Sequence, residues 1–347
     1  MTPSTSGCCA CPSLKAEHDE QRERGRHDTA IKRGDLIYAV LAVLSLAAGA
    51  GCSSKGAHDK PMVIASLHNL SEPFFIAIRR ELESEAARFD VEVSAVDGQS
   101  NSAKQTADVE AAIASGADGI ILAPTDVNAL TPAVESVLKA GIPIVTVDRR
   151  VENTSVSVPH VGADNVAGGR SMAQWVIENF PGGAHIVLIS GQPGSSSAID
   201  RTRGIHEALR SAGPQYHIVA EQSANWQREL GLTITQNILT SLGTQVPQVI
   251  LCEDDDMALG ALEALRTSGI SGVKVLGFNA TPEALARVRD GEMAATVEQS
   301  PVRQARAALQ QLVAKIRVHA QIPGASITPI LITQANISQA ERFGEVR

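Results

Sequence analysis

The chain has 347 residues, of which 44% are hydrophobic and 20% are charged, and this length and composition suit a globular protein of two domains. Its formal net charge is -8 at pH 7, and no run of Lys and Arg offsets this acidity. These features argue against nucleic acid or an anionic membrane surface as a partner. Aromatic residues make up only 3% of the chain, so a cluster of them is conspicuous.

The N-terminal part of the chain has the features of an export signal. Residues 1–31 are polar and mixed in charge, and we expect either a disordered leader or sequence that precedes the true translation start. Residues 32–51 combine two bases with a run of small and aliphatic residues, which is typical of a lipoprotein signal peptide. We therefore expect Cys52 to carry lipid and residues 52–60 to form a polar tether, although Gly49 stands where an aliphatic residue is usual. The alternative is a membrane anchor that is not cleaved.

From Met62 onward, short apolar runs alternate with stretches of helical periodicity. A first series of predicted strands covers residues 62–67, 91–96, 119–124 and 142–147, and a second covers residues 185–190, 216–221, 248–253, 273–278 and 294–299. Short apolar strands that are joined through helices pair in parallel, with right-handed crossovers and helices on both faces of the sheet. The sequence therefore predicts an α/β fold with two doubly wound parallel-sheet lobes.

The order of these segments predicts three passages of the chain between the lobes. They fall near Ala163, at residues 299–301 and at residues 328–329, and the last passage precedes a closing strand at residues 330–333. Three such passages make a hinge about which two lobes can open and close. The predicted N-terminal lobe comprises residues 61–162 and 300–328, the C-terminal lobe comprises residues 163–299 and 329–336, and residues 337–347 form a C-terminal tail.

Side chains that can bind a polar ligand follow the predicted strands at their carboxyl ends. In open parallel sheets, the loops beyond these strand ends form the ligand-binding crevice. Aromatic faces flanked by amide, carboxylate and guanidinium groups suit a small polyhydroxylated molecule, because a sugar ring has an apolar C–H face and an equator of hydroxyls. The residues at these positions are Glu72, Phe74, Phe75, Asp148, Arg149, Arg203, Trp226, Asp254, Phe278, Asn279 and Gln299.

Each of these positions also has a simpler interpretation. Phe75 suits the hydrophobic core as well as a ligand contact, and Asp148 with Arg149 could be an ion pair that closes the lobes. Any single strand-end acid could cap a helix. The recurrence of such residues at one structural position in many units favours a binding site.

Several motifs resemble those of periplasmic sugar-binding proteins of the ribose-binding type, in the family's order and nearly its spacing. They include "PFF" at 73–75, "ILAPTD" at 121–126, "VDR" at 147–149, "RTRG" at 201–204, "DDMALGAL" at 255–262 and "AATVEQSP" at 294–301. The resemblance covers about residues 62–334. It implies the type 1 periplasmic binding protein fold, and ligand-contact roles for Ser66 and for the strand-end residues named above other than Glu72.

The chain departs from the ribose pattern at three positions. Asp254 stands where that pattern has Asn, and Asn279 stands where it has Asp. Glu72 replaces an Asn, in a loop that is one residue longer. One net negative charge remains in the predicted cleft when its three acids are counted against its two arginines. A different pentose, a hexose, a polyol or a ligand with a cationic group therefore suits the cleft as well as ribose, or better.

The resemblance implies that the protein is the extracytoplasmic substrate-binding component of an ABC importer, which closes its lobes around a sugar or polyol. The expected partners are that small molecule and an ABC permease in the membrane. We expect a monomeric lipoprotein in the periplasm or at the cell surface, held by the lipid on Cys52. An exported sugar receptor for a chemoreceptor or a sensor kinase is the alternative, because both roles use the same lobe surfaces.

The motifs of other protein classes do not occur. The first predicted strand is not followed by G-x-G-x-x-G, no G-x-x-x-x-G-K-[ST] is present, and no nucleophile has a plausible base. His68 and His160 lie singly, which favours loop or core roles over metal binding. A transcription repressor of this fold would need a basic helix-turn-helix at the N-terminus, where the signal stands instead. We therefore expect no enzymatic activity, no cofactor, no metal and no nucleic acid.

The two predicted cleft arginines give a first test. Arg149→Ala or Arg203→Ala should weaken ligand binding by about 1–3 kcal/mol, because each change leaves a buried hydroxyl or acid unpaired. Titration calorimetry measures the effect, and unchanged affinity in both variants would remove these residues from the site.

Overall fold

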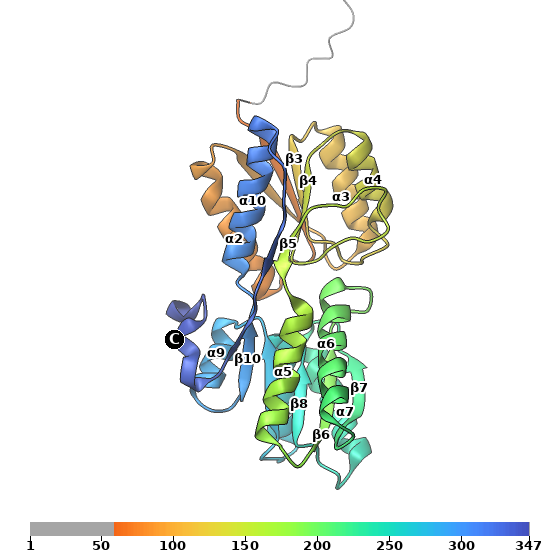
Figure 1. Ribbon diagram of the computed structural model, residues 1–347, viewed down its shortest axis with the longest axis vertical. Coiled ribbons are helices and arrows are strands. Elements are labelled where there is room, and N and C mark those ends of the chain that lie inside the picture. Colours follow the sequence, from red (N-terminus) through yellow and green to blue (C-terminus); the bar gives the residue numbers. More distant parts are fainter. Residues whose placement is uncertain (1–58, 347) are drawn as a thin grey trace, which may run out of the picture. The chain divides into compact units, whose positions relative to one another are not determined.

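The structure, a computed structural model, describes residues 59–346. Their strands form two six-stranded sheets, and each sheet has helices on both faces (Figure 1). The predicted fold class, two α/β lobes with parallel sheets, is therefore confirmed. The predicted leader, the signal peptide, Cys52 and nearly all of the tether lie outside the described residues.

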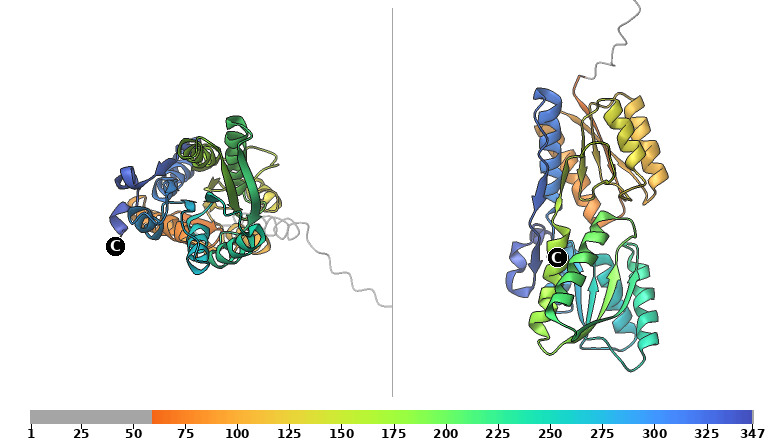
Figure 2. Two further views of the ribbon diagram at one scale, coloured as in Figure 1. Left: turned by 90° about the horizontal axis from the view of Figure 1, so that it is seen from below. Right: turned by 45° about the vertical axis from the view of Figure 1, so that its right-hand side comes forward.

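The first sheet is wholly parallel. Helices α2 (Pro73–Arg88) and α10 (Pro301–Val318) cover one face, and α3 (Ser102–Ala114) and α4 (Thr131–Lys139) cover the other (Figures 1 and 2). The strand order is β11 (Ala325–Ile327), β5 (His160–Ala163), β4 (Ile144–Val147), β3 (Gly119–Leu122), β1 (Met62–Leu67) and β2 (Glu92–Asp97).

The second sheet is parallel except at one edge, where the closing strand β12 pairs antiparallel with β10. Helices α5 (Asn165–Asn179) and α6 (Ser196–Ala212) pack on one face. The other face is covered by α7 (Arg228–Leu242), α8 (Asp255–Thr267) and α9 (Pro282–Arg289). The strand order is β12 (Ile330–Ile332), β10 (Ala295–Glu298), β9 (Lys274–Phe278), β8 (Val249–Cys252), β6 (Ala184–Ser190) and β7 (Tyr216–Ser223).

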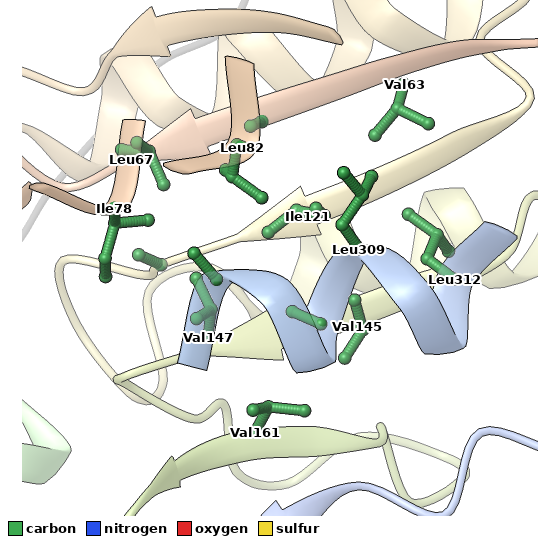
Figure 3. Close-up of a cluster of buried hydrophobic side chains, with 14 of the residues drawn as sticks. Val63, Leu67, Ile78, Leu82, Ile121, Val145, Val147, Val161, Leu309 and Leu312 are labelled. Atoms are coloured by element: carbon green, nitrogen blue, oxygen red, sulfur yellow. The ribbon is translucent and has the colours of Figure 1, made fainter. Parts of the chain in front are cut away.

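Helix α2 illustrates how the sequence pattern makes the core of the first lobe. Pro73 occupies the first turn, where its missing N–H costs no helical hydrogen bond. Phe75, Ile78 and Leu82 then recur at helical spacing and are fully or almost fully buried. They pack with Leu309 of α10 and with the aliphatic residues of β1, β3, β4 and β5 (Figure 3). This packing fixes the start of α2 against the ends of the strands.

The chain passes between the two sheets three times. Strand β5 of the first sheet leads into α5 of the second lobe, and β10 of the second sheet leads into α10 of the first. The third passage joins β11 to β12 at residues 328–329. After β12, two 3-10 helices (Gln334–Gln339 and Phe343–Glu345) pack on the second lobe, where Ala340 is buried against Leu285 and Ile332.

Helices α5 and α6 approach one another closely through two glycines. A Cβ atom added at Gly169 would collide with the carbonyl oxygen of Arg201, and one added at Gly204 would collide with the carbonyl oxygen of Val166. The contact is therefore reciprocal, and it leaves no room for a methyl group on either helix. It also sets the backbone position of Arg201.

Gly204→Ala should lower the free energy of unfolding by about 1–3 kcal/mol, because the added methyl group forces the two helices apart. Urea denaturation of the purified protein measures this change. Gly182→Ala is the matched control, since a Cβ atom there meets nothing within 4 Å. Equal stability of both variants would show that the helix contact is not tight.

Candidate functional site

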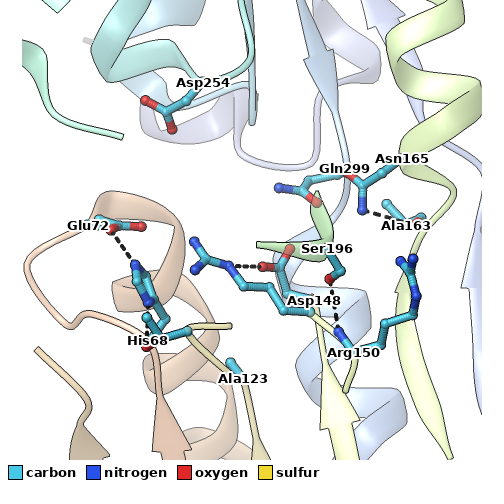
Figure 4. A network of polar contacts seen from close by, with 12 residues as sticks. His68, Glu72, Ala123, Asp148, Arg150, Ala163, Asn165, Ser196, Asp254 and Gln299 are labelled. Atoms are coloured by element: carbon cyan, nitrogen blue, oxygen red, sulfur yellow. Dashed lines mark hydrogen bonds and ion pairs between the residues drawn. The ribbon is translucent and has the colours of Figure 1, made fainter. Parts of the chain in front are cut away.

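The carboxyl ends of both sheets face a small cavity between the lobes, here called the interlobe cavity. Its free volume is about 20 Å³, far below the range of about 300–1,000 Å³ that is usual for drug-sized ligands, so the two lobes lie nearly closed on one another. Figure 4 shows side chains from both lobes around it, with Glu72 and Asp148 on one side and Asp254 on the other. The lining residues are Glu72, Phe74, Phe75, Asp148, Arg149, Ser197, Arg201, Trp226, Asp254, Asn279 and Gln299.

A tight turn after β4 directs Asp148 and Arg149 into the interlobe cavity. Asp148 has a φ of +62°, in the left-handed region that costs a non-glycine residue free energy. The N–H of Arg149 donates to the carbonyl oxygen of Val147 at 2.6 Å. Both charged residues are only 3% exposed, and they follow a strand that is buried along its whole length. The strand therefore delivers a buried ion pair to the junction of the lobes.

The guanidinium group of Arg149 lies between aromatic rings of the two lobes. Its Cζ is 5.4 Å from the ring centroid of Phe75 and 5.4 Å from that of Trp226, which is within the range of cation–π attraction. Its Nε is 3.6 Å from Oδ2 of Asp148. Nε and Nη1 nevertheless have no hydrogen-bond partner in the part of the chain that the structure describes. Buried donors of this kind are costly unless something accepts from them.

A second buried arginine, Arg201, lines the cavity from α6. Its Nε donates to Oδ1 of Asn165 at 2.8 Å, and its Nη1 donates to the carbonyl oxygen of Glu253 at 2.6 Å. Its Cζ is 3.6 Å from the ring centroid of Phe278. Burial lowers the pKa of Arg201 to about 10, against the opposing effect of nearby acids such as Asp148. The residue therefore stays charged at neutral pH and is held rigidly.

Trp226 reaches the cavity from the loop after β7, and a glycine makes room for it. The residue has a φ of +66°, and its indole ring occupies the space that a side chain at position 191 would take. Gly191 is thus required by the close approach of the ring. The indole Nε1 is buried and finds no hydrogen-bond partner among the described residues, so it is a further donor without an acceptor at this site.

Three polar side chains form a chain of hydrogen bonds on the second-lobe wall. Asn279 Nδ2 donates to Asp254 Oδ2 at 2.7 Å, and Gln299 Nε2 donates to Asn279 Oδ1 at 2.6 Å. With its amide turned over, Gln299 instead donates to Asp148 Oδ1 at 3.2 Å and accepts from Arg201 Nη2 at 3.1 Å. Asp254 also caps α8 by accepting from the N–H of Met257 at 3.1 Å.

Burial shifts the ionisation of the acids around the cavity. It raises the pKa of Glu72 to about 7 even though Arg149 opposes the shift, and it raises the pKa of Asp254 well above its ordinary value. His68 lies below Glu72, with 3.3 Å between Nε2 and Oε1. Burial and Arg149 hold the pKa of His68 well below its usual range. A neutral imidazole fits this position, with Nδ1 3.0 Å from the hydroxyl of Thr125.

The structure brings together nine of the twelve residues predicted from the sequence. Two others are buried outside the lining: Ser66 in β1 accepts from Gln105 Nε2 at 3.3 Å, and the ring of Phe278 packs against the guanidinium group of Arg201. The structure also adds Arg201 and Ser197 to the lining. The nine are Glu72, Phe74, Phe75, Asp148, Arg149, Trp226, Asp254, Asn279 and Gln299.

Arg203 does not line the interlobe cavity. Two residues along an α-helix correspond to a rotation of about 200°, so Arg203 and Arg201 leave α6 in different directions. The side chain of Arg203 is 51% exposed, and its Nη2 donates to Asp200 Oδ1 at 2.8 Å. Both arginines belong to the "RTRG" motif. The helical periodicity of the buried positions on α6 distinguishes them, because Arg201 belongs to the buried face and Arg203 does not.

Asp200 joins the lobes outside the cavity. It forms an ion pair with Arg150 of the first lobe as well as with Arg203. The backbone N–H of Arg150 donates to Ser196 Oγ at 3.0 Å (Figure 4), and that of Val127 donates to the carbonyl oxygen of Gly194 at 2.9 Å. These contacts hold the two lobes together beside the cavity.

Residues 59–346 contain no group of three or more His, Cys, Asp or Glu side chains placed to hold a metal ion. In the same range, every helix is too short or too polar to cross a membrane.

Comparisons with known proteins agree with this architecture. A family model described as a periplasmic binding protein domain matches residues 63–319. The ribose import binding protein RbsB of Bacillus subtilis (strain 168) is 36% identical over 273 residues, which are 76% of this chain and 87% of that protein.

Two solved structures of similar proteins contain a cyclic polyol. A Caulobacter myo-inositol binding protein bound to myo-inositol is 51% identical, with a TM-score of 0.81, and the match covers 82% of this chain and 97% of the other. An ABC transporter solute binding protein from Bacillus halodurans C-125 with bound myo-inositol is 27% identical, with a TM-score of 0.76 and coverage of 83% and 98%.

The raised pKa of Glu72 gives a test of the site's electrostatics. Because the folded protein keeps a proton at Glu72 that the unfolded chain releases above pH 4.5, this group lowers the free energy of unfolding progressively between pH 4.5 and about 7. Glu72→Gln removes that loss. As the pH rises from 4.5 to about 7, the free energy of unfolding of this variant should therefore increase by about 1–3 kcal/mol relative to that of the natural protein.

Urea denaturation at several pH values measures the difference. Glu83→Gln, at an exposed glutamate of the same helix, is the control. Parallel stability curves for Glu72→Gln and the natural protein would contradict the account of the buried carboxyl.

Proposed function

Since the chain belongs to the periplasmic binding protein family, we propose that it is the extracytoplasmic substrate-binding component of an ABC importer and binds a cyclic polyol or sugar in the interlobe cavity. The observation that carries this proposal is the set of buried donors on Arg149 and Trp226 that have no acceptor among residues 59–346. The role is binding and delivery of a solute, and it involves no catalysis.

The lining chemistry matches a polyhydroxylated ring. Arg149, Arg201 and Trp226 offer donors, and the carboxyl groups of Asp148 and Asp254 offer acceptors. Each ligand hydroxyl can accept from the first group and donate to the second, so no buried group need stay unpaired. The rings of Phe75 and Trp226 offer flat apolar surfaces for the C–H face of the ligand.

The charge of the lining favours an uncharged ligand. Against the two arginines stand Asp148 and two acids whose pKa is raised by burial, Glu72 to about 7 and Asp254 well above its ordinary value. At neutral pH these acids are therefore not all fully ionised, and the lining carries no net negative charge. A ligand with a cationic group gains little here. Among uncharged ligands, myo-inositol is the first candidate, since the Caulobacter protein that binds it is 51% identical to this chain.

Ligand binding is coupled to closure of the lobes. Phe75, Asp148 and Arg149 come from the first lobe, whereas Arg201, Trp226 and Asp254 come from the second. A ligand stabilises the closed state only through contacts to both sides. Arg150 and Asp200 add an ion pair between the lobes outside the cavity. The closed form then docks on a membrane permease as a monomer, and lipid on Cys52 with its short tether keeps the protein near that permease.

Ligand screening tests this function. The purified protein should bind myo-inositol with a higher affinity than ribose, allose or xylitol, and its melting temperature should rise with ligand concentration because only the folded state binds. Arg201→Met should weaken myo-inositol binding about tenfold or more, since it removes a buried charged donor.

Arg203→Met is the matched control, because it changes the same residue type two positions away, outside the cavity. We expect it to bind almost as the natural protein does. The absence of a melting-temperature shift with any sugar or polyol of the panel would contradict the proposed function, and equal losses in both variants would contradict the assignment of Arg201.

A further inference from the structure

The C-terminal segment after β12 contacts the backbone next to the interlobe cavity. It lies beyond residues 63–319, the range that the family model matches. Within it, Arg342 is 4% exposed. Its Nη2 donates to the carbonyl oxygen of Asn279 at 2.9 Å and to that of Ala280 at 3.3 Å. A charged side chain from the chain terminus is therefore buried against the loop that follows β9.

That loop has an unusual conformation. Asn279 has a φ of +111° and Ala280 a φ of +48°, and non-glycine residues keep such backbone only when the surroundings impose it. The N–H groups of Asn279 and Ala280 donate to Val297 O at 2.7 Å and to Thr296 Oγ1 at 3.1 Å. The carbonyl groups of the same two residues accept from Arg342. The turn is thus held from both sides.

The turn positions a side chain that lines the cavity. Asn279 lies between Asp254, which accepts from its Nδ2 at 2.7 Å, and Gln299, whose Nε2 donates to its Oδ1 at 2.6 Å. All three side chains line the interlobe cavity. A change in the backbone at Asn279 would move the middle member of this chain of hydrogen bonds. Arg342 itself does not line the cavity.

Neighbouring acids hold the segment in place at the hinge. Glu298 accepts from the N–H of Glu341 at 2.9 Å and from that of Ser300 at 2.6 Å. The carboxylate of Glu341 accepts from the N–H of Val302 at 2.9 Å, in the first turn of α10, where the helix dipole favours a negative charge. The segment therefore spans from the passage between β10 and α10 to the turn at Asn279.

We propose that Arg342 is a positioning residue for ligand binding: it holds the turn at Asn279 and Ala280, and thereby fixes the Asn279 side chain between Asp254 and Gln299. This inference rests on the proposed function for the identity of the ligand. The bracing of the turn by Arg342 is independent of that identity.

The test compares three variants of the purified protein by calorimetry with myo-inositol. Arg342→Met, which keeps the aliphatic stem and removes the donors, should weaken binding about tenfold. Arg342→Lys keeps one charged donor and should recover part of the affinity. Arg317→Met is the control, because Arg317 also donates to a backbone carbonyl, that of Asp90 at 2.8 Å, but far from the cavity wall. It should leave the dissociation constant unchanged.

Hydrogen exchange of the ligand-free protein tests the bracing directly. In Arg342→Met, the amides of residues 279–281 should exchange faster, while those of β8 keep their protection. A general loss of protection, or a loss of stability with an unchanged dissociation constant, would reduce Arg342 to a purely structural residue and overturn the proposal. If Arg342→Met does not fold, the dissociation constant and the hydrogen exchange of residues 279–281 are measured on Arg342→Lys instead.

The two hypotheses fail in different ways. A natural protein that binds no polyol or sugar refutes the proposed function, whatever the exchange rates. A natural protein that binds myo-inositol, together with Arg342 variants of natural affinity and natural exchange at residues 279–281, refutes the positioning role alone.

Discussion

Two arginine side chains are buried where the lobes meet, and the charge that they bring there constrains everything around them. Arg149 and Arg201 are each 3% exposed, and charges at such positions are stable only with compensating partners. The partners come from both lobes: Asp148 beside Arg149, the carbonyl oxygen of Glu253 at Arg201, and aromatic rings on each. The charged groups at the junction of the lobes therefore depend on one another and form one electrostatic unit. The donors that remain unpaired there require hydrogen-bond acceptors from a ligand.

The side chains of this unit are positioned by backbone conformations that are unfavourable in free energy. The turn at Asp148 and the loop at Trp226 both use positive φ values, and Gly191 gives the indole ring its place. The glycine contact between α5 and α6 fixes the backbone from which Arg201 leaves. Strain of this kind is common at binding sites, because the surrounding packing has to over-determine the conformation. Most of the contacts that do so lie outside the cavity itself.

Much of this organisation could be predicted from the sequence, because parallel strands place their carboxyl ends at one edge. The buried strand before Asp148 predicted that this residue lies at the carboxyl edge of its sheet. The same reasoning placed Trp226 and Asp254 at the corresponding edge of the second sheet. The antiparallel edge strand β12 carries no signal that distinguishes it from a parallel one. Arg201 was missed because both arginines of "RTRG" follow the same strand. They differ in the face of α6 that they occupy, which the periodicity of the buried positions on that helix indicates. Phe278 was expected at the ligand, whereas it lies beneath Arg201.

Arg342 shows the limit of such prediction most clearly. Nothing in its local sequence distinguishes it from an exposed arginine of a terminal tail, and its contacts with residues 279 and 280 depend on the path of the whole chain. The two acids near it, Glu298 and Glu341, likewise gain their roles only through the hinge geometry. Contacts between distant segments, and not the strand ends, are thus the part of the site that pattern analysis leaves out.

A crystal structure of the protein grown with myo-inositol tests the central claim most directly. The account predicts one ring in the interlobe cavity, with hydroxyl groups within hydrogen-bond distance of both Arg149 and Arg201 and a C–H face against Phe75 or Trp226. A ring that contacts one lobe only, or that lies elsewhere while the cavity holds no ligand, would contradict it.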